Sequence, residues 1–270
     1  MIDIVKELRK PEQVWILEAL TRRVPPGDAR TVREVEGKLR RAQAGFAGEK
    51  QLFFYLQSLA GSAETHLLLH NVRLVDESAY QMDVVVLTTR YVLILEVKHI
   101  HGLVHFGDHD QFTREDTNVE IFSNPLEQCL RQERLLKTFL EFHNLPAHFP
   151  VFSRVVFTSN KTILSVSEVC KTTIRERVWR GDAVVSKMKE LNFHHSHDQI
   201  SVKEMYRLAH VMMQHHTPAW LSPLKSFGLT FEDLQKGMYC LHCFGYTLQK
   251  EKWHTYWICS ECGNLEREPT

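Results

Sequence analysis

Two acidic residues and a lysine stand out within an apolar stretch, residues 81–98. The stretch consists of two short runs rich in Val, Ile and Leu around Thr88-Thr89-Arg90, and each run has the composition of a buried strand. Asp83 lies in the first run, and Glu96 and Lys98 lie in the second. An unpaired carboxylate in a buried strand costs several kcal/mol, so a compensating charge is expected. A divalent cation supplies such a charge, because Mg²⁺ binds carboxylate, water and phosphate oxygens.

The two runs form a β-hairpin if Thr89 and Arg90 make its loop. Thr88 then pairs with Tyr91, and counting outward places Asp83 opposite Glu96, where opposed side chains lie about 4.5–5.5 Å apart. Because side chains alternate along a strand, Lys98 shares a face with Glu96. The loop lacks the Gly or Asn-Gly of tight hairpins, so a register shifted by one residue stays open. A plain ion-pair cluster without a metal also stays open.

Further motifs accompany this arrangement in a fixed order. Asp83 with Glu96-Val97-Lys98 resembles the D…E-x-K signature of the PD-(D/E)xK nuclease superfamily. The whole set resembles the nuclease-related domain (NERD) family over roughly residues 40 to 160. The resemblance implies a restriction-endonuclease-like α/β fold with a mixed sheet flanked by helices. The motifs that carry it are Gly45-Phe46-Ala47-Gly48-Glu49, Gln81-Met82-Asp83, Glu96-Val97-Lys98 with Gly102 behind it, and Asn124-Pro125-Leu126-Glu127-Gln128.

The resemblance also implies a reaction, the Mg²⁺- or Mn²⁺-dependent hydrolysis of phosphodiester bonds, with DNA as the expected substrate. Asp83 and Glu96 would hold the metal, with the Val97 carbonyl as a further ligand. Lys98 would act on the attacking water. The rival hypothesis is a non-cleaving nucleic-acid-binding or adaptor protein that keeps the fold. All five site positions, which are Glu49, Asp83, Glu96, Lys98 and Gln128, are intact, and this favours the enzyme.

Two helices are expected to position the remaining site residues. Residues 45–48 suggest a flexible lead into a helix over residues 49–59, with Glu49 on its apolar stripe. The resemblance implies that Glu49 completes or buffers the metal site, whereas the residues alone also allow a Glu favoured by the helix dipole. Asn124 and Pro125 begin a second helix. Gln128 of that helix would orient the water or a phosphate oxygen, or else satisfy a backbone group.

Four of the six cysteines form two C-x-x-C pairs, Cys240 with Cys243 and Cys259 with Cys262, fifteen residues apart. This spacing predicts a tetrahedral thiolate site for a structural Zn²⁺ in a C-terminal zinc ribbon. Four sulfur ligands leave no position for a reactive water. The interleaved aromatic residues could stack on nucleic acid bases. A protein-docking or purely stabilising role is equally open.

Charge and hydropathy limit the partners. Lys+Arg and Asp+Glu number 33 each, so no global positive field indicates nucleic acid binding, and any such surface must be local. The basic residues within 171–180 are one candidate. No apolar run approaches the 18 or so residues of a membrane span, and the N-terminus lacks a signal-peptide pattern. We expect a cytoplasmic protein that binds nucleic acid and no membrane, and we leave open a homodimer or a protein partner.

The chain is expected to contain four parts. These are an N-terminal helical arm over residues 1–44, a NERD nuclease-like domain over 45–160, a mixed, mainly helical extension over 161–236, and the zinc ribbon over 237–270. Strands are expected over residues 66–75, 151–157 and 163–166. Ser201 and Glu204 have the spacing of a helix capping box.

Overall fold

The structure is a computed structural model that describes residues 1–25, 27–76, 78–115, 118–144, 146, 148–219, 222–250 and 252–267. The chain divides into two compact units. The first unit comprises Met1–Lys10 and Gln43–Trp220, and the second comprises Pro11–Ala42 and Leu221–Thr270. Among the described residues, no helix combines the length and the apolar character that crossing a membrane requires.

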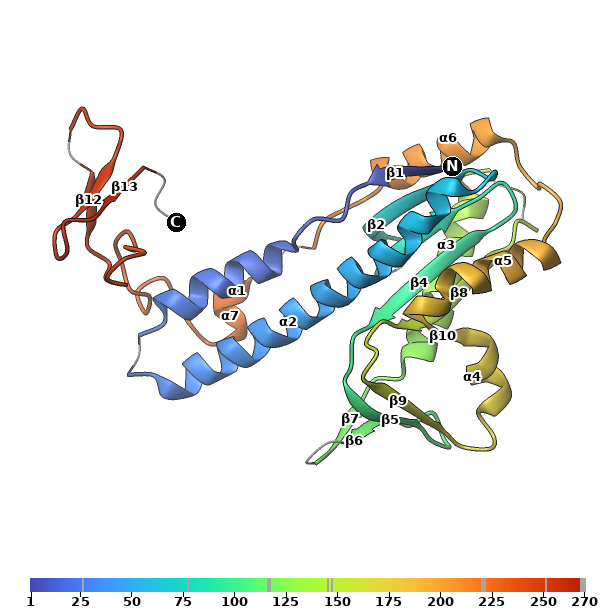
Figure 1. Cartoon of the computed structure of the whole chain (residues 1–270), viewed down its shortest axis with the longest axis horizontal. Coiled ribbons are helices and arrows are strands. Elements are labelled where there is room, and N and C mark those ends of the chain that lie inside the picture. Colours follow the sequence, from blue (N-terminus) through green and yellow to red (C-terminus); the bar gives the residue numbers. More distant parts are fainter. Residues whose placement is uncertain are drawn as a thin grey trace. The chain divides into compact units, whose positions relative to one another are not determined.

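A six-stranded mixed sheet forms the centre of the first unit (Figure 1). The three middle strands pair antiparallel with one another, and the outer pairs are parallel. The predicted mixed α/β fold is confirmed, together with the strands predicted over residues 66–75 and 151–157. In order across the sheet, the strands are β1 (Ile2–Lys6), β2 (His66–Val75), β3 (Ala79–Leu87), β4 (Val92–Lys98), β8 (Val151–Phe157) and β10 (Val178–Arg180).

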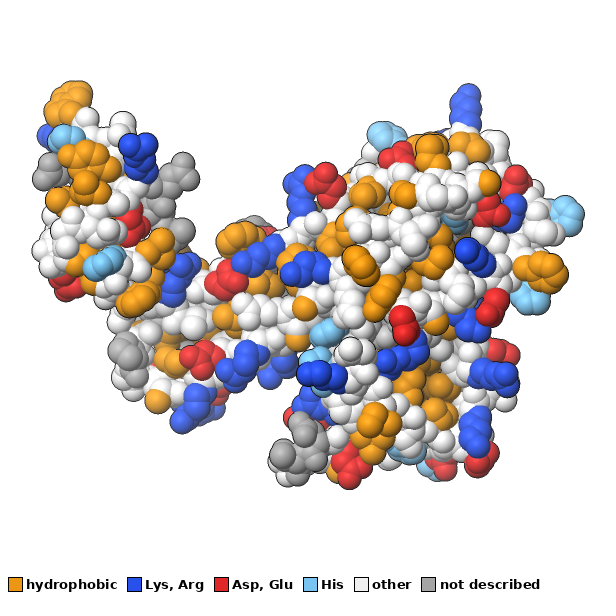
Figure 2. All heavy atoms as spheres, viewed as in Figure 1, with side chains coloured by type: hydrophobic (Ala, Val, Ile, Leu, Met, Phe, Trp, Pro, Cys, Tyr) orange, Lys and Arg blue, Asp and Glu red, His pale blue; other side chains and the backbone are white. Residues whose placement is uncertain are grey.

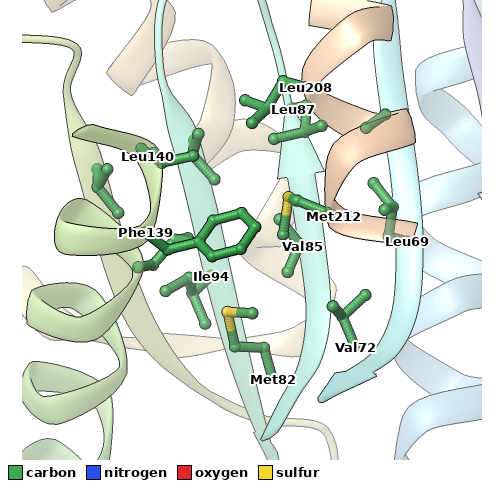
Figure 3. Packing of buried hydrophobic residues seen from close by; sticks show 14 of the residues in the cluster. Leu69, Val72, Met82, Val85, Leu87, Ile94, Phe139, Leu140, Leu208 and Met212 are labelled. Atoms are coloured by element: carbon green, nitrogen blue, oxygen red, sulfur yellow. The ribbon is translucent and has the colours of Figure 1, made fainter. Parts of the chain in front are cut away.

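Helices cover both faces of this sheet. On one face, α3 (Pro125–Phe142) and α6 (Val202–Gln214) pack apolar side chains against β2, β3 and β4, as Figure 3 shows for Phe139 and Met212. On the opposite face, the C-terminal part of α2 (Ala29–Leu56), the 3-10 turn η1 (Gln57–Gly61) and α5 (Val184–His194) pack against the alternate residues of the same strands. The sheet is therefore buried between two layers, which explains its nearly continuous apolar strands.

Two predicted helix starts are confirmed by their caps. The Asn124 side chain accepts a hydrogen bond from the Leu126 N–H at 2.9 Å, at the start of α3. Ser201 and Glu204 form the reciprocal capping box at the start of α6. Each cap satisfies backbone donors that have no partner within the helix, which fixes where the helix begins.

A smaller four-stranded sheet follows β4 in the chain and belongs to the first unit. Its apolar residues pack with Leu126 and Cys129 of α3 and with Ile174 of α4 (Lys171–Arg177). This packing supports the N-terminal end of α3. The remaining turn of the unit is η2 (Gly181–Ala183). In order across the smaller sheet, the strands are β7 (Val119–Phe122), β6 (Phe112–Glu115), β5 (Gly102–Phe106) and β9 (Thr162–Val166).

The second unit combines a small helical cluster with a small sheet. Apolar residues of α1 (Glu12–Arg23) and of the N-terminal part of α2 pack with those around α7 (Pro223–Ser226). The sheet consists of β11 (Leu248–Lys250), β12 (Trp257–Cys259) and β13 (Leu265–Glu266), all antiparallel. Figure 2 shows Lys and Arg side chains interspersed with Asp and Glu over the face in view, in keeping with the balanced composition.

Two expectations for the N-terminal part of the chain are wrong. Residues 1–44 are not helical throughout, because Ile2–Lys6 forms β1 and pairs with β2. Residues 45–48 are not a flexible lead, because α2 continues through them as one helix to Leu56 (Figure 1). Tertiary contacts decide both cases. A short edge strand needs its partner to form, and Gly48 is buried within the helix rather than exposed in a loop.

Candidate active site

The hairpin of β3 and β4 has the register predicted from its loop. Val84 pairs with Leu95, and Leu87 pairs with Val92. The Thr88 N–H donates to the Tyr91 carbonyl at 3.1 Å. Extending this register by one residue places Asp83 opposite Glu96. The Asp83 Oδ2 accepts a hydrogen bond from the Val97 N–H at 2.8 Å, so a side chain replaces a backbone acceptor at this point of the ladder.

Asp83 lies beside a point where the alternation of side chains between the two faces of the sheet is interrupted in both β2 and β3. Along a regular strand, side chains alternate between the two faces. Met82 and Val85 nevertheless pack in the same cluster, and on β2 so do Leu69 and Val72. Asn71, between these two residues of β2, has a φ of +51°. This interruption turns the Asp83 side chain toward the backbone of β4 instead of into either apolar layer.

Glu96 is buried, with 3% of its surface exposed, and both of its carboxylate oxygens have partners. Lys98 Nζ donates to Oε1 at 2.8 Å, and Gln132 Nε2 donates to Oε2 at 2.9 Å. Lys98 Nζ also donates to Gln128 Oε1 at 3.2 Å. Glu96, Lys98 and Gln128 therefore meet as expected, and Gln132 joins them from the next turn of α3.

The protonation of this cluster follows from burial and charge. Burial and the nearby carboxylates of Glu96 and Glu49 hold the pKa of Asp83 well above its ordinary value. Burial also disfavours the Lys98 ammonium. The charge and hydrogen bond of Glu96, with the charge of Asp83, outweigh this effect and raise the pKa of Lys98. The cluster thus disfavours full ionisation of its carboxyl groups unless a further cation is present.

Glu49 reaches the cluster from α2 because the helix runs close to the end of β4. A Cβ on Gly48 would lie 2.6 Å from the Cβ of His99 and 3.0 Å from the Thr158 Oγ1, so only glycine allows this approach. The Glu49 Oε2 accepts a hydrogen bond from the Asn71 Nδ2 at 2.8 Å. Burial raises the pKa of Glu49 to about 7, although the Asn71 hydrogen bond opposes the shift, and the charge of Glu96 adds to it.

The oxygen atoms of this cluster are the kind of ligand that a hard divalent cation binds. Three carboxylates influence one another in a buried setting, and a cation would relieve their repulsion. Gln132 Oε1 is buried, and it has no hydrogen-bond partner among the described residues. Val97 is held to the cluster through its N–H group. The predicted role of its carbonyl as a metal ligand stays a prediction.

The segment that contains these residues matches a known protein family. A family model described as nuclease-related domain, NERD, matches residues 44–158. This segment of the chain is a nuclease-related domain. The comparisons with curated proteins and with solved structures found no significant match. The matched segment contains Glu49, Asp83, Glu96, Lys98 and Gln128, so the expected site residues all lie inside it. The match indicates a nuclease-related function for the segment, and such a function implies an interaction with nucleic acid.

A groove of about 800 Å³ runs along the exposed side of α3 in the nuclease-related domain. Gln128, which accepts from Lys98, forms part of its wall. Arg131 and Arg134 lie on the same wall. One nitrogen of Arg131 donates to the Ser78 hydroxyl at 2.9 Å and to the Ala79 carbonyl at 3.2 Å, which leaves the rest of its guanidinium group for a ligand. The groove thus joins the candidate site to two guanidinium groups. Its lining residues are Asp110, Ser123, Asn124, Glu127, Gln128, Leu130, Arg131 and Arg134.

The basic stretch within residues 171–180 contributes less to a binding surface than its composition suggests. Arg177 pairs with Glu133 at 3.3 Å. Arg180 donates to the carbonyl groups of Thr162 and Ser159, both at 2.9 Å. These two arginines bind neighbouring parts of the fold and are therefore less available to a ligand.

Four thiol groups of the second unit meet at a separate site. The Sγ atoms of Cys240, Cys243, Cys259 and Cys262 lie within 4.8 Å of one another, with distances of 3.7 Å for Cys240–Cys262 and 3.5 Å for Cys243–Cys259. A tetrahedral zinc site with Zn–S bonds of about 2.3 Å requires sulfur atoms about 3.8 Å apart. The Thr247 hydroxyl, 3.1 Å from the Cys259 Sγ, lowers the pKa of Cys259 to about 6. The geometry and the chemistry of these residues fit zinc.

Of the groups that complete the carboxylate site, Asn71 and Lys6 were not predicted from the sequence, and Gln132 was not assigned a role. Gln132 had a usable signal, since it follows Gln128 by four residues on the same face of a helix. Asn71 had a weaker signal, because Asn tolerates a positive φ better than most residues. Lys6, which donates to the carbonyl groups of His70 and Asn71, had none, because its strand was expected to be a helix.

Proposed function

We propose that the nuclease-related domain hydrolyses phosphodiester bonds with the help of Mg²⁺ or Mn²⁺ and that DNA is its substrate. The observation that carries the proposal is the buried pairing of Asp83 with β4, beside Glu96 bonded to Lys98 and Gln132. Buried acids gathered around one lysine are costly to a fold unless they serve a cation.

Asp83 and Glu96 would hold the metal, with the Val97 carbonyl as a further ligand and Glu49 completing the site. A bound Mg²⁺ would lower the pKa of a coordinated water and stabilise negative charge on a phosphate group. The shared hydrogen bond between Lys98 and Glu96 suggests how the chain responds. If the Glu96 Oε1 served a cation instead of the Lys98 Nζ, this ammonium would be available to the attacking water or to a phosphate oxygen. Gln128 keeps the ammonium in place.

The groove along α3 is the proposed path for the substrate strand. A polyanion is repelled by the carboxylates, so cations beside the entrance are needed to hold it. Arg131 and Arg134 are three residues apart on one face of the helix, where side chains of successive turns are neighbours. Their guanidinium groups would bind phosphates next to the one that Gln128 and Lys98 contact.

The four cysteines would hold a structural Zn²⁺ that folds the C-terminal sheet. With four sulfur ligands, such a site has no open position for a substrate or a reactive water. The zinc therefore has no place in the proposed hydrolysis. Its role would be to stabilise a segment whose own apolar cluster is small.

The proposal is tested by incubating linear, nicked and single-stranded DNA, and RNA, with the full chain and Mg²⁺ or Mn²⁺. Asp83→Asn and Lys98→Met are expected to lower the cleavage rate by about 10²–10⁴-fold, the range for removing a positioned catalytic group. Asp182→Asn and Lys203→Met, at exposed positions, are the matched controls and should retain the rate. If the wild type binds nucleic acid and cleaves none of the substrates, the function is binding or scaffolding instead.

A further inference from the structure

The first strand of the chain contacts the candidate site although it lies outside the matched segment. β1 pairs in parallel with β2, and its register shifts between Ile4 and Lys6. Lys6 Nζ then donates to two consecutive carbonyl groups, those of His70 at 2.7 Å and of Asn71 at 3.1 Å. In a regular strand, consecutive carbonyl groups point in opposite directions, so one ammonium cannot reach both. The φ of +51° at Asn71 is what turns them toward Lys6.

The Asn71 side chain uses this backbone conformation to hold two other side chains. Its Nδ2 donates to the Glu49 Oε2 at 2.8 Å, and its Oδ1 accepts from the Gln81 Nε2 at 3.0 Å. The Gln81 carbonyl in turn accepts from the Gln132 Nε2 at 2.7 Å. Because Gln132 also donates to Glu96, one hydrogen-bonded chain joins Glu49 to Glu96.

This chain opposes a specific electrostatic tendency. Glu49 lies in range of the charges of both Asp83 and Glu96. Without a restraint, the repulsion among the three carboxylates would favour rotamers of Glu49 that turn its carboxylate away from the others. The Asn71 amide supplies the restraint, and the Lys6 ammonium stabilises the unusual backbone that directs the amide. Packing alone would not require these hydrogen bonds of Asn71 and Lys6.

We propose that Lys6 and Asn71 are positioning residues of the active site, with Lys6 fixing the backbone at Asn71 and the Asn71 amide directing Glu49 toward Asp83 and Glu96. The inference rests on the proposed function, in that the held carboxylate serves a divalent cation. It also extends the working domain beyond the matched segment, because residues 2–6 become part of it. β1 is then a functional element and not only an edge strand.

Two substitutions at Asn71 separate the side chain from the backbone. Asn71→Gly allows the positive φ and the Lys6 contacts but removes the amide, whereas Asn71→Ala removes the amide and also strains the backbone. Mn²⁺ binding is measured by calorimetry on the full, zinc-loaded chain. Outer partners of metal ligands typically contribute about 10–100-fold in affinity. We expect a loss of that size for Asn71→Gly, with an unchanged melting temperature without Mn²⁺ and an unchanged KM for DNA. Asn160→Gly, in an exposed turn, is the control.

Lys6 is tested in the same way with a conservative variant beside it. Lys6→Met should weaken Mn²⁺ binding in the same direction as Asn71→Gly, and Lys6→Arg should restore part of it, because a guanidinium can still donate to two carbonyl groups. If Asn71→Gly binds Mn²⁺ like the wild type while its melting temperature falls, Asn71 is only structural and the inference is overturned. A wild type that binds no Mn²⁺ overturns it as well.

The two proposals can fail separately. If the wild type binds Mn²⁺, Asn71→Gly loses this binding, and neither cleaves nucleic acid, the positioning role is supported and the nuclease activity is ruled out. If the Asn71→Gly and Lys6→Met variants cleave DNA as fast as the wild type does, the nuclease activity is supported and the positioning role is ruled out.

Discussion

The carboxylate cluster and the cysteine cluster differ in how their side chains are held. The four Sγ atoms lie within 4.8 Å of one another, and among the described residues no acidic group of three meets in this way. In the carboxylate cluster, Glu96 is instead bonded to Lys98 and Gln132, and Glu49 to Asn71. The four cysteine thiols contact one another, whereas each carboxylate is bonded to a neighbouring amide or ammonium group. Those neighbouring groups can exchange this partner for another. The first arrangement suits a structural ion and the second suits chemistry.

The largest effect is expected from breaking the cysteine cluster. Structural zinc in small domains contributes an apparent binding energy of about 10–16 kcal/mol, all of it available to folding. Cys259→Ser should therefore remove zinc and unfold β11 to β13, measured as zinc content and as lost dispersion of the NMR signals of Trp257. Cys170→Ser, in the first unit, is the matched control and should keep its zinc. A C-terminal sheet that stays folded without zinc would show that the metal is not needed to hold these strands.

The next largest effect concerns the neighbours of the carboxylates. Gln132→Leu removes the donor to Glu96 and to the Gln81 carbonyl, so the concentration of Mg²⁺ needed for half-maximal activity should rise by about 10–100-fold. Gln57→Leu, at an exposed position in η1, is the control. An unchanged Mg²⁺ dependence would show that Gln132 only fills the core.

The approach of α2 to the site is tested by a pair of glycines. Gly48→Ala should destabilise the first unit by about 1–3 kcal/mol, because the added Cβ meets His99 and the helix must move away with Glu49. Gly45→Ala meets no described atom within 4 Å and should stabilise the helix by up to about 1 kcal/mol. Urea unfolding measures both. Equal effects would mean that α2 does not press against the end of β4.

The pH dependence of stability reports on Glu49. Burial raises the pKa of Glu49 from 4.5 to about 7, so the folded protein binds this proton more tightly than the unfolded chain does. The stabilisation is complete below pH 4.5 and is lost as the pH rises through 7. Without added Mg²⁺, the melting temperature should therefore fall more steeply between about pH 5 and 8 in the wild type than in Glu49→Gln. Parallel curves would contradict the burial of this carboxyl.

The smallest effect is expected in the groove. Arg131→Gln and Arg134→Gln should each reduce the slope of DNA affinity against salt concentration by about one unit, because each removes one phosphate contact. The turnover number at saturating DNA should stay unchanged. Arg207→Gln, an exposed arginine of α6, should leave the slope as it is. If all three variants behave alike, the substrate strand follows another path.

The two sites also differ in how far the sequence predicts them. All four cysteines come from two tight pairs, so local spacing was sufficient. The pairing of Asp83 with Glu96 was predictable because a two-residue loop sets the register of a hairpin. Lys6 and Asn71 could not be predicted in this way. Parallel pairing of a five-residue edge strand leaves no local pattern, and a positive φ inside a strand contradicts the usual alternation. The continuity of α2 was missed because its glycines resemble a loop until their neighbours are known.

Selective removal of divalent cations distinguishes the roles of the two sites. The full chain is treated with a weak chelator that removes Mg²⁺ and Mn²⁺ but leaves tightly bound zinc. DNA cleavage is then measured as Mg²⁺ is added back. We predict that activity disappears and returns with Mg²⁺ while zinc stays at one ion per chain, and that Asp83→Asn shows no recovery. Cleavage that persists without Mg²⁺, or that follows the zinc content, would contradict the division of roles between the two sites.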